Sequence, residues 1–247
     1  MRPFHPLIER IAQGLRPDWQ KLQQLQPLAI PSDLKQVRGE LEGDALQIDN
    51  EFLSCAGLRK IHLETARVGP HLDILHCVLF PDPCYNLPIF GADVVAGRGC
   101  VSAAIVDLSP SGTDLPEQID ADLAELQVRP YGQRRDVPGW GSIFSPHVLF
   151  IRPDSAAEEE WFLNDVLSFH RIFIDAVCQT QPDPPTHSHS ISRYEGQLRY
   201  CQQQRRNDKT RRVLESAFDA HWADNYICKL LFDDPLPPAE QPCQLTP

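Results

Sequence analysis

Four neighbouring segments of the chain have the composition of β-strands and are joined by short connections. They cover residues 59–68, 71–80, 88–97 and 99–108. Glycine and proline mark the connections, as in Gly69-Pro70 and Gly97-Arg98-Gly99. A parallel return needs a crossover of about a dozen residues, so connections this short join antiparallel strands. An antiparallel sheet is therefore predicted for the middle of the chain.

Two further regions extend this sheet. Residues 37–43 and 45–53 form a predicted hairpin that turns at Gly43-Asp44, and residues 147–153 form one more strand. Several strands are apolar at almost every position, which is typical of a sheet covered on both faces.

Helical patterns on either side of the strands supply the covering layers. Residues 115–128 form one helix, and a second begins at Ser155, whose spacing to Glu158 matches a capping box. Residues 191–232 are predicted to form two more helices, and residues 181–190 a loop. The predicted fold class is α/β, a three-layer α/β/α sandwich with a central antiparallel sheet.

The chain is long enough for one packed domain. Its 247 residues are 42% hydrophobic, and a fold of this size buries about 70–75% of the surface of the unfolded chain. We predict a single domain over residues 1–232, in which residues 1–30 form an N-terminal helical arm that Pro17 interrupts. Residues 233–247 contain five prolines, and we predict a disordered tail there.

Charge and hydropathy exclude several classes of protein. With 23 basic and 34 acidic residues, the net charge is −11, which is the wrong sign for a general nucleic-acid-binding protein. No apolar run reaches the roughly 18 residues of a membrane span. Arg10 and Arg16 interrupt the apolar residues near the start, unlike a signal peptide. We therefore expect a cytoplasmic protein.

The cysteines and histidines do not suggest a metal centre. None of the eight cysteines forms a C-x-x-C pair, and several lie within apolar runs, so we expect reduced, structural thiols. His187 and His189 lie in a proline-rich loop without a third candidate ligand nearby. No bound metal is expected.

Glu64, His76 and Asp93 are ionisable residues within otherwise apolar strands. An unpaired buried charge is costly, so such residues are either paired for structural reasons or kept for chemistry. The twofold alternation of a strand places His62 with Glu64 on one face, and His76 with Val78 on one face of the next strand. Glu64 and His76 can therefore share a cavity, which Asp93 could join. These residues alone leave two interpretations open: satisfied core polar groups, or an acid/base pocket of unspecified reaction.

Three stretches of the sequence carry a more specific pattern. They are residues 72–110 (LDILHCVLFPDPCYNLPIFGADVVAGRGCVSAAIVDLSP), 138–144 (PGWGSIF) and 200–218 (YCQQQRRNDKTRRVLESAF). With them, the chain resembles the ferredoxin-dependent bilin reductases from about Leu41 to Phe232. The resemblance implies an α/β/α sandwich that binds biliverdin between the sheet and the C-terminal helices. It also implies no intrinsic metal or flavin cofactor, with electrons supplied by an external two-iron, two-sulfur ferredoxin.

The same resemblance implies residue roles. Asp93 and His76 would be the proton-donating pair that faces the tetrapyrrole, and Glu64 would stand near the D-ring vinyl group. This combination points to the branch of the family that reduces biliverdin IXα to phycocyanobilin with four single electrons through bilin radicals, the D-ring vinyl before the A ring. The implied substrate-binding positions are Arg135, Ser102, Gln204, Asn207, Lys209, Asp208, Trp140, Val78 and His62.

A ferredoxin is acidic, so its docking on a chain of net charge −11 requires a local basic patch. The dense basic segment after Gln204 is the predicted docking site. The alternative interpretation is that it is only the solvated face of a helix. Its cationic residues are Arg205, Arg206, Lys209, Arg211 and Arg212. We expect a monomer, with a phycobiliprotein or phytochrome as the acceptor of its product. A sister reductase that forms phycoerythrobilin and a non-catalytic bilin carrier stay open as alternatives.

Overall fold

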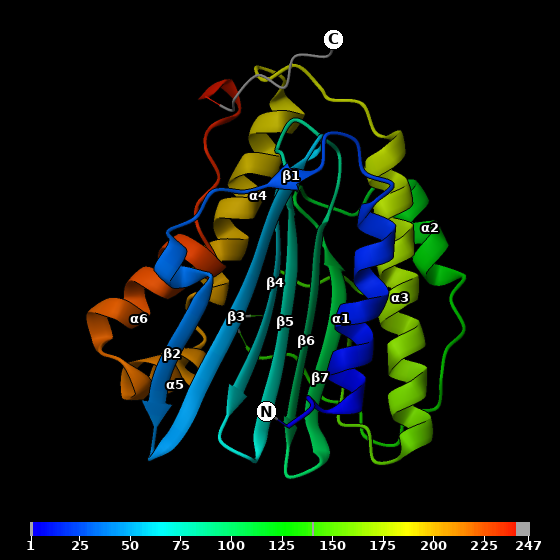
Figure 1. Ribbon diagram of the computed structural model, residues 1–247. Coiled ribbons are helices and arrows are strands. Elements are labelled where there is room, and N and C mark those ends of the chain that lie inside the picture. The colour runs from blue at the N-terminus through cyan, green and yellow to red at the C-terminus, as the bar shows by residue number, and fades with distance from the viewer. Residues whose placement is uncertain (1, 140, 241–247) are drawn as a thin grey trace.

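A large antiparallel sheet forms the middle of the molecule (Figure 1). The structure is a computed structural model and describes residues 2–139 and 141–240. The described strands are β1 (Gln26–Pro27), β2 (Gln36–Leu41), β3 (Asp44–Cys55), β4 (Leu58–Val68), β5 (Leu72–Pro81), β6 (Ile89–Gly97), β7 (Cys100–Ser109) and β8 (Leu149–Ile151). Their order is β1-β3-β4-β5-β6-β7-β8, and β2 also pairs with β3. Every pairing among them is antiparallel, as predicted.

The turn predicted at Gly97-Arg98-Gly99 is confirmed, whereas the turn predicted at Gly43-Asp44 lies one residue earlier, because Asp44 already belongs to β3. Glu42 and Gly43 join β2 to β3 with φ of 53° and 87°, and Arg98 and Gly99 join β6 to β7 with φ of 52° and 79°. Two successive residues with positive φ give the turn whose twist matches that of the flanking strands. These turns hold the registers of the long hairpins.

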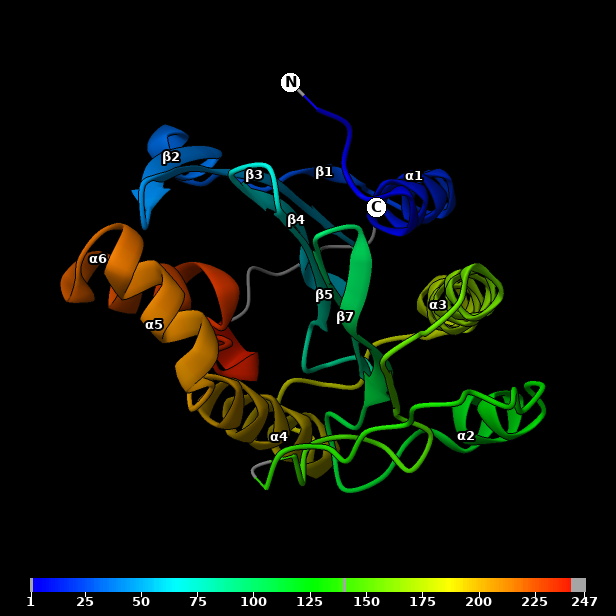
Figure 2. The same cartoon turned by 90° about the horizontal axis from the view of Figure 1, so that it is seen from below.

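Helices cover both faces of the sheet, so the predicted three-layer sandwich is confirmed (Figure 2). The described helices are α1 (Pro6–Trp19), α2 (Glu117–Ala124), α3 (Ala156–Gln179), α4 (Ser188–Gln204), α5 (Asp208–Ala217) and α6 (Ala220–Tyr226). One core lies between the sheet and α1, α2 and α3 and includes Phe162 and Phe173. The other lies between the sheet and α4, α5 and α6 and includes Phe80 and Tyr200. Within residues 2–139 and 141–240, no helix is both long and apolar enough to cross a membrane.

Helix α1 does not stop at the predicted interruption. It continues past Pro17 to Trp19, which is buried and donates its indole N–H to Nε2 of His170 at 3.0 Å. A proline this close to the end of a helix removes few helical hydrogen bonds. The burial of Trp19 stabilises the last turn, so helix α1 packs into the core.

The start of α3 is confirmed, whereas the C-terminal helices differ from the prediction. Ser155 caps α3 by accepting a hydrogen bond from the backbone N–H of Glu158. Residues 191–232, predicted as two helices, contain most of α4, all of α5 and α6, and a π-helical turn, Ile227–Leu231. Asn207 and Asp219 cap α5 and α6, and each cap begins a new helix.

Candidate active site

A cavity of about 970 Å³ lies between the sheet and the layer of C-terminal helices. Its floor comes from the face of β3 to β7 that carries Ile48, Ala66 and Ile74, and its rim comes from the end of α4 and from α5. Leu231 and Phe232, which follow α6, form part of one wall. The site is therefore assembled from the middle and the end of the chain.

Glu64, His76 and Asp93 form a continuous row across this floor. In the strand registers Glu64 pairs with His76, and His76 pairs with Asp93. All three side chains line the cavity. The structure thus brings together the three residues that the sequence singled out, because directly opposite residues of an antiparallel sheet point to the same face.

His76 and Asp93 form a hydrogen-bonded pair. Nδ1 of His76 lies 2.6 Å from Oδ1 of Asp93. Burial acts to lower the pKa of His76, but the charge and hydrogen bond of Asp93, together with the charge of Glu64, outweigh burial and raise that pKa above its usual value. The Asp93 side chain is 44% exposed, against 13% for His76. The pair can therefore hold a proton at the open surface of the cavity.

Glu64 is a second acid in the row. Burial raises the pKa of this carboxyl group, although the charge of His76 and the hydrogen bond from Tyr226 act in the opposite direction. Tyr226 donates its O–H to Oε2 of Glu64 at 2.7 Å. Glu64 therefore retains a proton to a higher pH than an exposed glutamate does.

Several residues predicted to bind the substrate also line the cavity. They are Arg135, Gln204, Asn207, Asp208 and Lys209. Arg206 and Arg212, predicted for ferredoxin docking, line it as well. The rim thus carries several cationic side chains beside an apolar floor.

Other predicted substrate contacts lie elsewhere. His62 and Val78 are buried in the protein beside the cavity rather than in its lining. His62 stacks on Phe52 at 4.0 Å between ring centroids, and burial holds its pKa well below the usual value, so it is neutral. Ser102 is exposed on β7 and donates to the carbonyl of Val95 at 3.1 Å. Trp140 lies outside the described residues.

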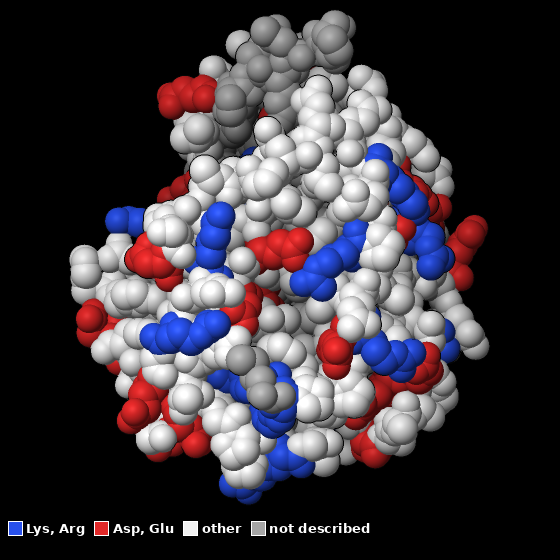
Figure 3. Space-filling model, viewed as in Figure 1, with Lys and Arg blue, Asp and Glu red and all other residues white. Residues whose placement is uncertain are grey.

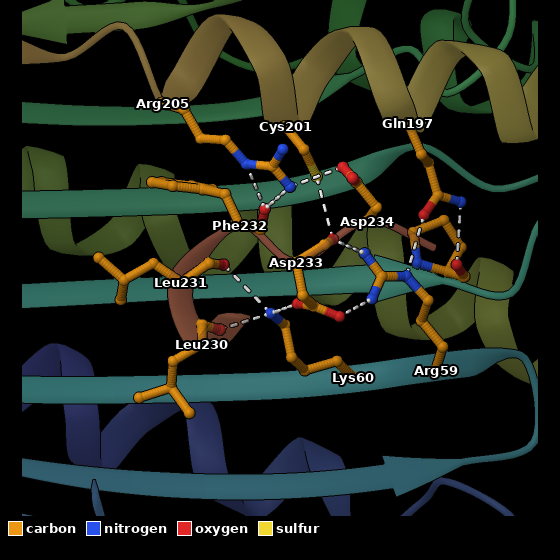
Figure 4. Close-up of polar contacts among 11 residues, drawn as sticks. Arg59, Lys60, Gln197, Cys201, Arg205, Leu230, Leu231, Phe232, Asp233 and Asp234 are labelled. Atoms are coloured by element: carbon orange, nitrogen blue, oxygen red, sulfur yellow. Dashed lines mark hydrogen bonds and ion pairs between the residues drawn. The ribbon is translucent and has the colours of Figure 1, made fainter. Parts of the chain in front are cut away.

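Three cationic side chains hold the backbone of the segment that carries Leu231 and Phe232 (Figure 4). Nζ of Lys60 donates to the carbonyls of Leu230 and Leu231, at 2.7 and 3.1 Å. Arg205 donates to the carbonyl of Phe232 at 2.9 Å, and Arg59 to that of Asp233 at 3.1 Å. Each of four consecutive carbonyls, residues 230–233, is thus bound by a lysine or an arginine.

Asp233 supplies the countercharge for this cluster. Its carboxylate pairs with Lys60 and, at 2.7 Å, with Arg59 (Figure 4). Burial lowers the pKa of Lys60 to about 8, against the opposing charge of Asp233. Asp233 is the first residue of the predicted tail, so the packed part of the chain continues past the boundary predicted at Phe232. Phe232, held in this way, contacts the His76 ring edge-on, with 5.6 Å between ring centroids.

Lys60, Asn50 and Tyr226 are site-forming residues that the sequence interpretation missed. Lys60 is on the same strand face as His62 and Glu64, at alternate positions. This spacing in the sequence could have indicated that Lys60 points to the same side of the sheet. Asn50 pairs in register with Glu64 from the neighbouring strand. Tyr226 comes from α6, and no local pattern connects it to the sheet.

The loop before α4 contains a third candidate metal ligand, contrary to the expectation. Donor atoms of Asp183, His187 and His189 all lie within 4.8 Å of one another. Asp183 also accepts a hydrogen bond from Arg193 at 2.7 Å, and Nδ1 of His187 caps α4 by accepting from the backbone N–H of His189. The side chains of Asp183 and His187 therefore already have protein partners.

The chain is similar to known proteins over most of its length. Residues 12–233 match the family model described as ferredoxin-dependent bilin reductase. The chain is 54% identical over 235 residues to the phycocyanobilin:ferredoxin oxidoreductase of Synechococcus sp. (strain CC9902), which covers 95% of this chain and 96% of that protein. It is 49% identical over 234 residues to the protein of the same name from Prochlorococcus marinus (strain MIT 9313), covering 95% and 89% of the two chains.

A solved structure shows the same fold. The crystal structure of phytochromobilin synthase from tomato in complex with biliverdin superposes with a TM-score of 0.72 at 18% identity. The match covers 91% of this chain and 82% of the tomato chain. At this identity the likeness supports the fold alone.

Proposed function

The chain belongs to the ferredoxin-dependent bilin reductases, and from this premise we propose that it reduces biliverdin IXα to phycocyanobilin with electrons from reduced ferredoxin. The observation that carries the proposal is the row Glu64–His76–Asp93, which places three titratable groups side by side on the floor of one large cavity. Such a row supplies acids where a conjugated substrate would lie.

The cavity suits a tetrapyrrole with two propionates. Its floor includes Leu46, Ile48 and Ile74, which offer an apolar surface for the conjugated rings. Arg135 and Lys209 lie among the lining residues, and the planar donors of an arginine match a carboxylate. A volume of about 970 Å³ is at the upper end of the range of small-molecule sites.

The reaction consumes four electrons and four protons. Each electron from ferredoxin adds negative charge to the bilin, which then takes up a proton from the protein. The first two electrons and two protons convert the D-ring vinyl group to ethyl, with Glu64 as the nearby donor. The second two electrons and two protons reduce the A ring, and the His76–Asp93 pair supplies protons on the same face of the sheet.

An anaerobic incubation with biliverdin IXα and reduced ferredoxin, followed by chromatographic identification of the bilin, tests the proposal. We expect phycocyanobilin. Phycoerythrobilin would show the sister regiochemistry, and biliverdin recovered unchanged but bound would show a carrier; either result would overturn the proposal. The raised pKa values of Glu64 and His76 favour the enzyme over the carrier, because binding alone needs no stored protons.

Glu64→Gln should block reduction of the D-ring vinyl group. The amide fits the same space but has no acid proton to donate, so we expect phycocyanobilin formation at least about 100-fold slower. Chromatography of the reaction over time measures this rate. Glu51→Gln is the matched control, since Glu51 is on the neighbouring strand and pairs with Arg16 outside the cavity. Phycocyanobilin formed at the normal rate by Glu64→Gln would remove Glu64 from the mechanism.

We propose that ferredoxin docks on the start of α5. On the face shown in Figure 3, Lys and Arg are interspersed with Asp and Glu. A positive patch that binds ferredoxin therefore has to be local. Arg205 and Arg211 are paired with Asp234 and Asp224. The remaining three cations of the segment form no ion pair with any residue that the structure describes; they are Arg206, Lys209 and Arg212.

Arg206→Glu should raise the KM for ferredoxin several-fold at low ionic strength, and added salt should reduce the difference. Steady-state rates at limiting ferredoxin measure it. Arg171→Glu makes the same change of net charge on α3, which covers the opposite face of the sheet, and should have no such effect. Equal KM values for the two variants would contradict docking on α5.

A further inference from the structure

We propose that Tyr226 is a positioning residue for Glu64. The hydroxyl group of Tyr226 donates a hydrogen bond to one carboxyl oxygen of Glu64. The acid proton of Glu64 is then carried on the other oxygen, within the cavity. The inference rests on the proposed function of Glu64 as a proton donor, and it adds a residue of α6 to the protonation machinery. The inference rests on four hydrogen bonds that link Leu34, Asn50, His62, Tyr226 and Glu64. The direction of one bond determines the direction of the next.

The backbone carbonyl of Leu34 determines the orientation of the Asn50 side-chain amide. A carbonyl oxygen can only accept, so the side-chain atom of Asn50 that lies 2.8 Å from it must be the amide nitrogen. The same nitrogen lies 2.8 Å from the hydroxyl oxygen of Tyr226 and donates to it. The amide oxygen of Asn50 then faces Nε2 of His62 at 2.8 Å. Since His62 is neutral, its single N–H is on Nε2.

The orientation of Asn50 determines the direction of the tyrosine O–H. Its oxygen already accepts from Asn50, and its proton is directed at Oε2 of Glu64, 2.7 Å away, rather than at the more distant Asn50 oxygen at 3.2 Å. Burial raises the pKa of Tyr226 well above its usual value, so the hydroxyl keeps its proton. Oε2 of Glu64 is therefore an acceptor.

The acid proton of Glu64 is then assigned to Oε1, because the oxygen of a carboxyl group that carries no proton is the stronger hydrogen-bond acceptor and Oε2 is the oxygen that accepts. Among the described residues, no hydrogen-bond donor or acceptor contacts Oε1, while Glu64 itself lines the cavity. The tyrosine ring is fixed by stacking on Trp222, with 4.8 Å between ring centroids, and Trp222 stacks on Phe218 at 3.9 Å. A carboxyl group held at one oxygen presents its proton in one direction, which is what transfer to a fixed vinyl group requires.

Tyr226→Phe tests this inference, because it removes one oxygen atom and keeps the ring. We expect the D-ring step to slow by about tenfold or more, while the KM for biliverdin stays within about twofold of the wild-type value. The hydrogen bond also stabilises the Glu64 carboxylate, so its loss raises the pKa of Glu64 further. The alkaline limb of the rate profile should therefore move to higher pH even as the rate falls.

Tyr131→Phe is the matched control. Tyr131 is buried and donates its O–H to a carboxylate, Asp165, at 2.6 Å, but it lies in the core on the opposite face of the sheet. A purely structural role of Tyr226 would give both variants the same rates and pH profiles, and that result would overturn the inference. Glu64→Gln separates the two hypotheses: if it is fully active, the proposed function of Glu64 fails, whereas if it is impaired and Tyr226→Phe is not, only the positioning role fails.

Infrared spectroscopy gives a measurement that needs no turnover. The carboxyl band of Glu64 can be assigned by its loss in Glu64→Gln. It should shift in Tyr226→Phe and stay in place in Tyr131→Phe, because only the first variant removes a hydrogen bond to Glu64. An unshifted band in Tyr226→Phe would overturn the inference.

Discussion

Asp93→Asn should stop turnover while biliverdin still binds. Asparagine has nearly the same shape as aspartate, so the cavity keeps its form, but the group can neither carry the acid proton nor hold up the pKa of His76. With the negative charge gone, burial is the dominant influence on His76 and lowers its pKa. A general acid contributes about 10²–10⁴-fold to a rate, and we expect a loss in that range. Anaerobic turnover with reduced ferredoxin measures the rate, and absorbance titration with biliverdin measures the affinity.

The pH dependence of the rate gives a second test of Asp93→Asn, because the direction of its shift can be predicted. The raised pKa of His76 keeps the pair protonated to a higher pH in the wild-type enzyme. Any residual activity of Asp93→Asn should therefore disappear at a lower pH than wild-type activity does. Asp120→Asn is the control, because Asp120 also pairs with a histidine, His147, at 2.8 Å but on the surface. Full turnover by Asp93→Asn would refute the role of the pair.

Lys60→Met should cause the largest loss of stability of the variants considered. It leaves the carboxylate of Asp233 facing Arg59 alone, and it leaves the carbonyls of Leu230 and Leu231 without their donor. Removing one partner of a buried ion pair costs about 3–5 kcal/mol, and the lower end of that range applies because the Asp233 side chain is 31% exposed and keeps Arg59 as a partner. We expect the free energy of unfolding, measured by urea denaturation, to fall by about that amount.

Two further variants distinguish this explanation from a general loss of charge. Lys21→Met breaks an ion pair with Asp18 in which the lysine side chain is 53% exposed, and it should leave the urea midpoint almost unchanged. The double variant Lys60→Met/Asp233→Asn should recover part of the stability, since it also removes a carboxylate that has lost one of its two cationic partners. A Lys60→Met variant as stable as Lys21→Met would show that the cationic cluster does not hold the C-terminal segment.

The sheet and its acidic row could be predicted because they depend on local signals. Short connections require antiparallel neighbours, and twofold alternation then assigns faces. Glu64 and His76 are opposite each other because the turn near Gly69 is tight, and Asp93 lies opposite His76 because residues 82–88 connect β5 to β6 as the next antiparallel pair.

The remaining parts of the site depend on contacts between distant parts of the chain. Tyr226 meets Glu64 across 162 positions, and Lys60 meets Asp233 across 173. The sequence pattern within one segment does not indicate a contact with a distant one. The proline-rich composition after Phe232 predicted a disordered tail, although Asp233 is held by Lys60 and Arg59. The caps at Asn207 and Asp219 are different, because these residue types at those positions were visible signals of helix starts.

The structure of the biliverdin complex is the most direct test of the central claim that protons held on one face of the sheet are delivered to a bilin as it is reduced. We expect the tetrapyrrole to lie in the cavity over β4, β5 and β6, with Asp93 and His76 at hydrogen-bonding distance from its polar edge. Glu64 should face the D-ring vinyl group, with Tyr226 still bound to its other oxygen. A bilin bound outside this cavity, or one from which all three acidic groups turn away, would contradict the account.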